Sequence, residues 1–371
     1  MNVAVTIQHP AHVHFFRNAI GELAAAGHDV RIFARRAEIV ADLLEAYELP
    51  YEMLAGTADS LPSLAVTQAT YEARLLARMR RFEPDVITAI GGVAAAHVAR
   101  AVGARSVVFY DTEDATLSNA LAFPLAHRVC TPESYRGEAS GHHVRYPGYH
   151  ELAYLHPDRF APDPSILEEI GIETDEDGTP IQRLVVLRLV AWNAAHDVGA
   201  TGSGIEDIGD AVARLEATGA RVLITAEGSL PAAIDDRQVS VPPHRVRHLL
   251  YYADVFIGES PTMATEAAVL GTPALYVSAR RLGYVDELEQ TYGLIATFSD
   301  VNRHENALRR AISILKREDR TERQVRREVL LSEKVDTTDV IVREVTAEGE
   351  HATRRSPGPP DPGEGRVTTE R

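Results

Sequence analysis

The chain has 371 residues, of which 45% are apolar, and its formal net charge is −16. This length and this apolar content are sufficient for two domains, each with a core of its own. The excess of acidic residues argues against nucleic acid or an anionic membrane surface as the main partner.

Strand and helix patterns alternate through the first half of the chain. Such alternation indicates a parallel sheet with helices on both faces. Because the sequence opens on a strand without a basic leader and has no apolar run long enough to span a bilayer, we expect neither a signal peptide nor a membrane span. The expected strands are residues 3–7, 29–34, 85–90 and 106–110, and the expected helices are 15–26, 38–47, 68–82 and 93–102.

Three histidines follow the first strand, in the run His9-Pro10-Ala11-His12-Val13-His14. They lie at the carboxyl edge of the expected sheet, where sites of α/β proteins form. Clustered histidines can transfer protons, contact a substrate, cap or pack a helix start, or bind a metal. Since no Asp, Glu or Cys completes a local ligand set, we expect no metal and favour proton transfer or substrate contact. His12 and His14 are the candidates.

An acidic run, Asp111-Thr112-Glu113-Asp114, follows the strand at 106–110. A solvated loop is the ordinary interpretation, but the place after a buried strand makes Asp111 or Glu113 a candidate base for an acceptor hydroxyl. The single cysteine, Cys130, lies in an apolar run and predicts a buried thiol. Because one cysteine allows no internal disulfide, a reducing cytoplasm is the expected location.

Residues 147–164 are rich in proline, tyrosine and histidine, which predicts an ordered linker. Strand patterns resume at 184–190, 221–226, 255–257 and 274–277, so we expect two tandem Rossmann-like α/β domains. The chain then reads as helical from 302 to about 346, with a break near 335–336. The expected parts are an N-terminal domain (1–150), a linker (151–180), a C-terminal domain (181–332), a last helix (333–347) and a disordered tail (348–371).

The segment from 254 to 277 is the most informative about function. Gly258 permits a turn after the strand, Ser260 can cap a helix, and that helix should run to about Leu270. A helix that begins at the carboxyl end of a parallel strand points its free N–H groups at the crevice where phosphates bind. Glu266, about one turn inside the helix, is close enough to accept hydrogen bonds from a ribose. A solvated helix glutamate is the alternative.

This segment resembles the nucleotide-sugar-binding motif of GT-B glycosyltransferases and of the non-hydrolysing UDP-GlcNAc 2-epimerases. The resemblance implies that the turn from Ser260 to Thr262 meets the pyrophosphate and that Glu266 binds the ribose. It also implies that the last helix packs on the first domain. Many relatives have consecutive glycines where this chain has Gly258, Glu259 and Ser260, and an anionic Glu259 beside a diphosphate is unfavourable unless it points away.

Two further positions in the second half are candidates for donor binding. Arg188 leaves the first strand of the C-terminal domain, where a guanidinium can neutralise a diphosphate by a bidentate contact. His244 lies in the loop that contacts the nucleobase in GT-B relatives. The opening His-Pro-x-His-Val-His and the Asp111-Thr112-Glu113 run also resemble an uncharacterised archaeal family, the domain of unknown function 354 family, over nearly all of residues 1–346.

The combined hypothesis is a GT-B-like glycosyltransferase with its site in an interdomain cleft and a nucleotide-sugar donor, most simply a UDP-sugar. The acceptor is not identified by the sequence, a homodimer is left open, and no cofactor is expected because arginine and helix N–H groups can balance the diphosphate. One alternative is a UDP-GlcNAc 2-epimerase, although the chain lacks the Gly-Thr-Arg-Pro-Glu-like and His-Arg-Arg-Glu-Asn-like segments of those enzymes. Another is a non-catalytic sugar-nucleotide-binding protein, which Glu259 favours.

Only Lys316 and Lys334 are lysines, so 38 − 2 = 36 basic residues are arginine, a bias typical of a salt-adapted (halophilic) or GC-rich source.

Overall fold

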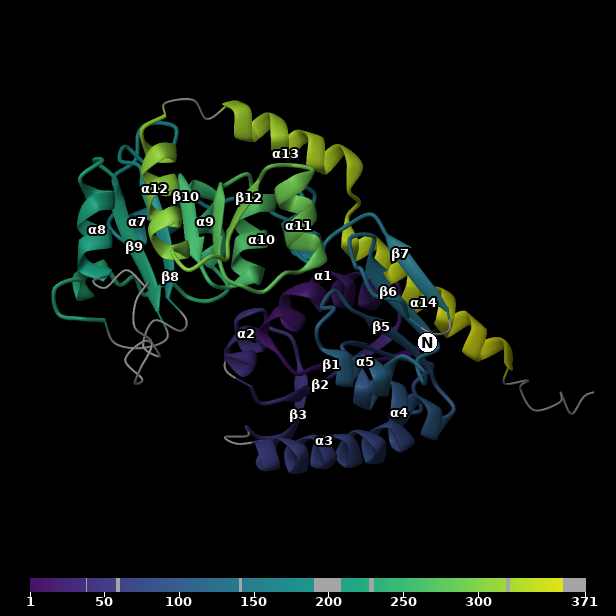
Figure 1. The fold of residues 1–371 in the computed structure, drawn as a ribbon. Helices are drawn as coiled ribbons and strands as arrows, with labels where there is room; N and C mark the ends of the chain where they lie inside the picture. Colours follow the sequence, from purple (N-terminus) through teal and green to yellow (C-terminus); the bar gives the residue numbers. More distant parts are fainter. Residues whose placement is uncertain are drawn as a thin grey trace, which may run out of the picture.

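The computed structural model describes residues 1–37, 39–57, 61–139, 142–189, 208–226, 230–317 and 321–355. The chain forms two sheets, each flanked by helices. In the view of Figure 1 the C-terminal sheet lies above the N-terminal one. All strand pairs within them are parallel. The expected α/β class with two Rossmann-like domains is confirmed.

The N-terminal sheet has seven strands in the order β3-β2-β1-β4-β5-β6-β7. The chain reverses its direction of travel across the sheet between β1 and β4, which makes their carboxyl ends the switch point where open α/β sheets bind ligands. Its strands are β1 (Asn2–Ile7), β2 (Asp29–Arg35), β3 (Tyr51–Ala55), β4 (Val86–Ile90), β5 (Arg105–Phe109), β6 (Arg128–Pro132) and β7 (His143–Tyr146), and its helices are α1 (Pro10–Ala25), α2 (Val40–Ala46), α3 (Leu61–Phe82), α4 (Val93–Val102) and α5 (Thr116–Ala122).

The C-terminal sheet has five strands in the order β12-β11-β10-β8-β9. Here the reversal falls between β8 and β10, so the second switch point lies at the carboxyl ends of these two strands. The strands are β8 (Leu184–Leu189), β9 (Arg221–Ala226), β10 (Val255–Gly258), β11 (Ala274–Val277) and β12 (Ile295–Phe298), and the helices are α8 (Ile208–Glu216), α9 (Val246–Tyr252), α10 (Pro261–Val269), α11 (Gly283–Gln290) and α12 (Arg303–Leu315).

Strands expected from the sequence are confirmed to within one or two residues, but four were missed: β3, β6, β7 and β12. β3 and β7 are edge strands with several half-buried positions, so neither gives the continuous apolar run of a central strand. Cys130 lies on β6 and is buried, as expected. Burial raises the pKa of its thiol well above the ordinary value, which keeps the thiol protonated.

The chain crosses between the domains twice. The first crossing carries α6 (Leu152–Leu155) and α7 (Ser165–Glu169), and the second carries α13 (Thr321–Glu333) and α14 (Thr337–Arg355). In Figure 1, α13 lies along the C-terminal domain and α14 lies along the N-terminal one, where it contacts α1, α6, β4 and β5. The two helices are separated at residues 334–336, where a break is expected, and the last helix packs on the first domain.

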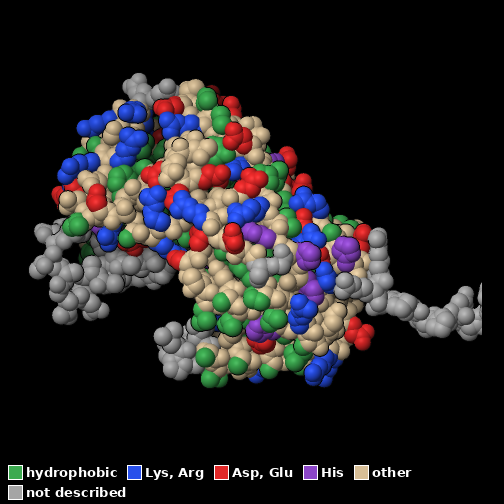
Figure 2. Space-filling model, turned by 45° about the vertical axis from the view of Figure 1, so that its right-hand side comes forward, with side chains coloured by type: hydrophobic (Ala, Val, Ile, Leu, Met, Phe, Trp, Pro, Cys, Tyr) green, Lys and Arg blue, Asp and Glu red, His purple; other side chains and the backbone are tan. Residues whose placement is uncertain are grey.

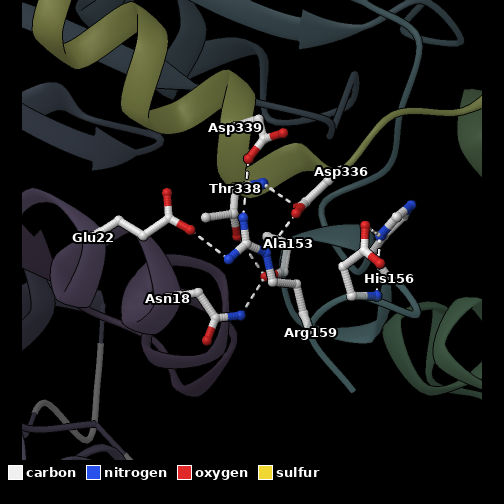
Figure 3. Close-up of polar contacts among 9 residues, drawn as sticks. Asn18, Glu22, Ala153, His156, Arg159, Asp336, Thr338 and Asp339 are labelled. Carbon is white, nitrogen blue, oxygen red and sulfur yellow. Dashed lines mark hydrogen bonds and ion pairs between the residues drawn. The ribbon is translucent and has the colours of Figure 1, made fainter. Parts of the chain in front are cut away.

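Arg159 ties the two crossings to the N-terminal domain (Figure 3). Its guanidinium donates to Asp336 Oδ2 at 2.5 Å and Asp339 Oδ1 at 2.9 Å, at the start of α14, and also to Glu22 of α1. Beside it, Thr338 Oγ1 donates to the carbonyl of Ala153 at 2.7 Å. The beginning of α14 is therefore fixed to α1 and to the first crossing at once.

The expected start of a disordered tail at residue 348 is wrong, because α14 continues to Arg355. Glu348 is 1% exposed and its carboxylate lies 2.5 Å from Arg105 and 2.8 Å from Arg128, at the starts of β5 and β6. One turn earlier, Glu344 also pairs with Arg128. These carboxylates anchor a stretch whose low apolar content suggested disorder. Residues 356–371 lie outside the described part of the chain.

One hydrophobic cluster extends through both domains and includes Phe15 of α1, Tyr154 of α6, Ala264 of α10 and Val345 of α14. Figure 2 shows that on one face of the molecule acidic and basic side chains are interspersed, mainly over the C-terminal domain, while several histidines gather over the N-terminal one. Within the described ranges, no helix is both long enough and apolar enough to cross a membrane.

Candidate functional site

Arg188 and Gly258 are register partners on β8 and β10, at the switch point of the C-terminal sheet. A Cβ on Gly258 would lie 2.9 Å from the Cβ of Arg188 and 2.8 Å from Cζ of Phe256. Glycine is required here because Arg188 approaches the backbone so closely. The half-buried arginine thus lies at the switch point, which is where open α/β sheets bind their ligands.

The helix that follows begins as expected. Ser260 is the N-cap of α10 and its hydroxyl accepts from the backbone N–H of Met263 at 3.3 Å, while Pro261 occupies the first turn. Thr262, in the same turn, is half-buried. Glu259 Oε1 lies 3.7 Å from Nε2 of His304 on α12, where an imidazolium would offset its charge. The start of α10 therefore meets the carboxyl end of β10 beside Arg188, with the acidic side chain directed to α12.

Glu266 is not a solvated helix glutamate, since it is only 3% exposed. Its Oε1 accepts from the hydroxyl of Tyr154 and from Nε of Arg247, both at 2.9 Å. The guanidinium of Arg247 also lies over the ring of Tyr154, 4.8 Å from its centroid. Burial opposes the charge on Arg247, but the nearby Glu266 raises its pKa above the ordinary value. Glu266 was a candidate from the sequence, but its two partners, Arg247 and Tyr154, were not.

His14 and His244 approach the same place from opposite domains. Nδ1 of His14 is 3.1 Å from the hydroxyl of Tyr47, and the Tyr47 ring lies 6.0 Å from that of His244. His14 also packs against Tyr154, at 5.5 Å between ring centroids. Burial, and then the charge of Arg247, lowers the pKa of His14 well below the ordinary value, so its ring is neutral. The structure therefore brings His14, His244 and Glu266 together around two tyrosines.

His12 and Asp111 belong to a second group, at the carboxyl edge of the N-terminal sheet. Asp111 Oδ2 lies 3.1 Å from Nδ1 of His150, and its Oδ1 accepts from the hydroxyl of Thr112 at 2.8 Å. Burial acts to raise the pKa of Asp111, but His150 and Thr112 outweigh it and hold the pKa below the ordinary value. Burial lowers the pKa of His12 to about 3, with help from the neighbouring His9 and His150. His12 is thus a weak base.

Two residues of this second group were missed by the sequence. His150 and Glu151 lie in the first crossing, and they are 7% and 4% exposed. Burial, and then the charge of Asp111, raises the pKa of Glu151 well above the ordinary value, which favours the neutral carboxyl group. The tyrosine- and histidine-rich composition of the linker was the only sign in the sequence that it could carry site residues. No sequence spacing indicates that this segment contacts Asp111.

The rest of the acidic run binds the C-terminal domain. Glu113 Oε1 accepts from the backbone N–H of Gly283, at the start of α11, at 3.0 Å. Asp114 receives two hydrogen bonds of 2.6 Å from Arg280. Glu113 and Asp114 therefore hold the domains together, while Asp111 faces His150. In the described part of the chain, no three His, Cys, Asp or Glu side chains are placed to hold a metal ion.

Solved structures of this architecture cover nearly the whole chain. The spinosyn forosaminyltransferase SpnP is 17% identical, with a TM-score of 0.62, and the match covers 94% of this chain and 99% of that one. The UDP-GlcNAc 2-epimerase from Neisseria meningitidis bound to UDP-GlcNAc is 14% identical, with a TM-score of 0.61 over 90% of this chain and 100% of that one. The S. aureus MnaA-UDP structure is 12% identical, with a TM-score of 0.65 over 96% and 99%. At these identities the likeness shows the GT-B-like fold alone.

None of the curated proteins compared with the chain matches it. The sequence does match one family model, described as "Protein of unknown function (DUF354)", over residues 1–348. This range includes both domains, the two crossings and most of α14. The chain belongs to the DUF354 family.

Proposed function

We propose that this protein is a nucleotide-sugar-dependent glycosyltransferase of GT-B type, with a UDP-sugar as donor. One observation carries the proposal: Arg188, Gly258 and the start of α10 meet at the switch point of the C-terminal sheet. A guanidinium and free helix N–H groups on a glycine-lined edge are the groups that bind a diphosphate without a metal. The proposal includes no cofactor.

The proposed donor site extends from the phosphates to the nucleoside. Ser260 and Thr262 would contact the pyrophosphate from the first turn of α10, and Glu266 would bind the ribose. His244 would contact the base from the loop before α9. Structures of the same fold with bound UDP-GlcNAc and with UDP support this choice of ligand class.

The acceptor would approach from the N-terminal domain, where His12 and Asp111 lie at the carboxyl edge of the sheet and His14 packs against Tyr154 of the first crossing. Transfer requires an acceptor hydroxyl near the anomeric carbon, removal of its proton, and stabilisation of the leaving diphosphate. Arg188 and the helix N–H groups would supply the last of these. We infer a cytoplasmic location, because the donors proposed here are cytoplasmic metabolites.

A UDP-GlcNAc 2-epimerase is the second candidate, favoured by the epimerases among the similar structures. Product analysis separates the two reactions. The purified protein is incubated with UDP-GlcNAc, with and without a pool of hydroxyl acceptors, and the nucleotides are resolved by anion-exchange chromatography. A transferase releases UDP in proportion to glycosylated acceptor, whereas an epimerase yields a second UDP-sugar without acceptor. If donors bind and neither product forms, the protein is a non-catalytic sugar-nucleotide-binding protein.

A further inference from the structure

His150 is held on two sides at the carboxyl edge of the N-terminal sheet. Its ring packs on Phe15 of α1, at 4.5 Å between ring centroids, and its Nδ1 lies 3.1 Å from Asp111 Oδ2. With 7% of its surface exposed, the side chain has little freedom to turn away. Two neighbours from different elements thus fix both the position and the orientation of the imidazole.

The second ring nitrogen of His150 has no partner. Nε2 is buried, and among the residues that the structure describes none hydrogen-bonds to it. Buried polar atoms in proteins are nearly always hydrogen-bonded, so such an atom calls for a ligand. An ionised carboxylate can only accept, so Asp111 requires the proton on Nδ1. In the neutral ring Nε2 then carries the lone pair and can accept a proton from a hydroxyl group.

The two histidines chosen from the sequence lack this arrangement. Nδ1 of His12 is 3.4 Å from the backbone N–H of Gln8, and Nδ1 of His14 is 3.1 Å from the hydroxyl of Tyr47. Neither contact is with a carboxylate, which would stabilise the imidazolium formed by proton transfer. Of these three rings, the one on Asp111 is therefore best built to take a proton.

We propose that His150 accepts the proton of the acceptor hydroxyl through Nε2, and that Asp111 is its positioning residue. This inference rests on the proposed function and deepens it. As the acceptor oxygen bonds to the anomeric carbon, its proton passes to Nε2. The bond from that carbon to the diphosphate oxygen breaks, and its electron pair leaves with the nucleoside diphosphate. The imidazolium beside Asp111 then releases its proton to solvent.

The test compares substitutions that remove different parts of the ring. His150→Asn keeps a donor near the position of Nδ1 for Asp111 but removes Nε2, and His150→Ala removes both. The readout is nucleoside diphosphate release from UDP-GlcNAc, UDP-glucose, GDP-mannose or dTDP-glucose, with water or a hydroxyl acceptor. We expect kcat to fall ~10²- to 10⁴-fold in both variants. Donor affinity by calorimetry and the thermal midpoint should be retained in His150→Asn.

Two further variants and a rescue experiment make the test specific. His142→Ala, at an exposed position eight residues earlier, should behave as wild type. Added imidazole should restore part of the turnover of His150→Ala, since it can occupy the space left by the ring. Asp111→Asn should lower kcat with little change in KM for the donor, and imidazole should not rescue it. A merely structural role for His150 would predict loss of the fold without rescue.

The outcomes separate the inference from the function on which it rests. Wild-type turnover in His150→Asn would overturn the inference alone, and so would a larger loss in His12→Asn than in His150→Asn. Wild-type protein that binds donors but releases no nucleoside diphosphate from any of them would overturn the proposed function and the inference with it.

Discussion

Removing the carboxylate of Glu266 should destabilise the folded protein even when no ligand is bound. Glu266 and Arg247 have side chains only 4% and 8% exposed, and the carboxylate accepts from both Arg247 and Tyr154. In Glu266→Ala the guanidinium stays buried without its counter-charge. Breaking a buried pair from one side in this way typically costs about 3–5 kcal/mol.

This cost converts to a large shift in the thermal midpoint. For domains of about 150–250 residues, 1 kcal/mol corresponds to about 2–4 °C, so the expected decrease is roughly 6–20 °C. Glu266→Gln keeps an acceptor oxygen for Tyr154 and Arg247, so its thermal midpoint should decrease less. Replacing both partners by apolar residues, as in Glu266→Leu with Arg247→Met, should recover much of the loss, because no buried charge remains.

The assay is thermal unfolding followed by circular dichroism, with Glu328→Ala as the matched control. Glu328 is exposed on α13, and exposed substitutions usually change stability by about 0.5 kcal/mol or less. A Glu266→Ala midpoint equal to that of the control would refute the reasoning. The result also decides how binding is tested, since a weakened fold in Glu266→Ala would imitate a lost ribose contact.

Three other perturbations have defined outcomes. Gly258→Ala places a Cβ 2.9 Å from that of Arg188, so it should displace the arginine and weaken UDP binding by about tenfold or more. The same substitution should lower the free energy of unfolding by about 1–3 kcal/mol. Unchanged UDP affinity by calorimetry would exclude Arg188 from the site. The folded-state pKa values of His12 (about 3) and His14 are lowered, so below pH 6.5 the unfolded chain binds more protons than the folded one. The free energy of unfolding should therefore fall as the pH drops, for His12 between pH 6.5 and about 3. Urea midpoints measured across this range should fall less steeply in His14→Gln, and an unaltered slope would contradict a neutral buried His14. Arg159→Ala should accelerate hydrogen exchange at the start of α14, because it removes the guanidinium that pairs with Asp336 and Asp339 there. Exchange equal to that of Arg309→Ala, an exposed position on α12, would show that Arg159 does not anchor the helix.

Local chemistry explains why the α10 segment was predictable. Ser260 and Pro261 specify where the helix begins, and Gly271, with a φ of +87°, specifies where it ends. These signals act within a few residues and need no knowledge of the rest of the fold. The central strands were predictable for a similar reason, because strands buried on both faces appear as continuous apolar runs.

The environment of the candidate site could not be predicted in the same way. Tyr154 and Glu266 are hydrogen-bonded although 112 residues separate them, and Arg247 is 19 residues from Glu266. Whether a helix glutamate is solvated or buried depends on such partners, which only the packing of the two domains brings together. His150 illustrates the same limit, since its contact with Asp111 arises from the first crossing folding back on the N-terminal sheet.

Calorimetric titration with UDP, UDP-GlcNAc, GDP-mannose and dTDP-glucose tests the central claim most directly. The wild-type protein is compared with Arg188→Ala and with Glu266→Gln, whose folded state is first verified by its thermal midpoint. We expect selective binding of the UDP compounds, weakened by about tenfold or more in each variant, as for the loss of a charged hydrogen bond. Affinity that is the same in all three proteins, or no binding of any nucleotide to the wild type, would contradict a nucleotide-sugar site at the switch point of the C-terminal sheet.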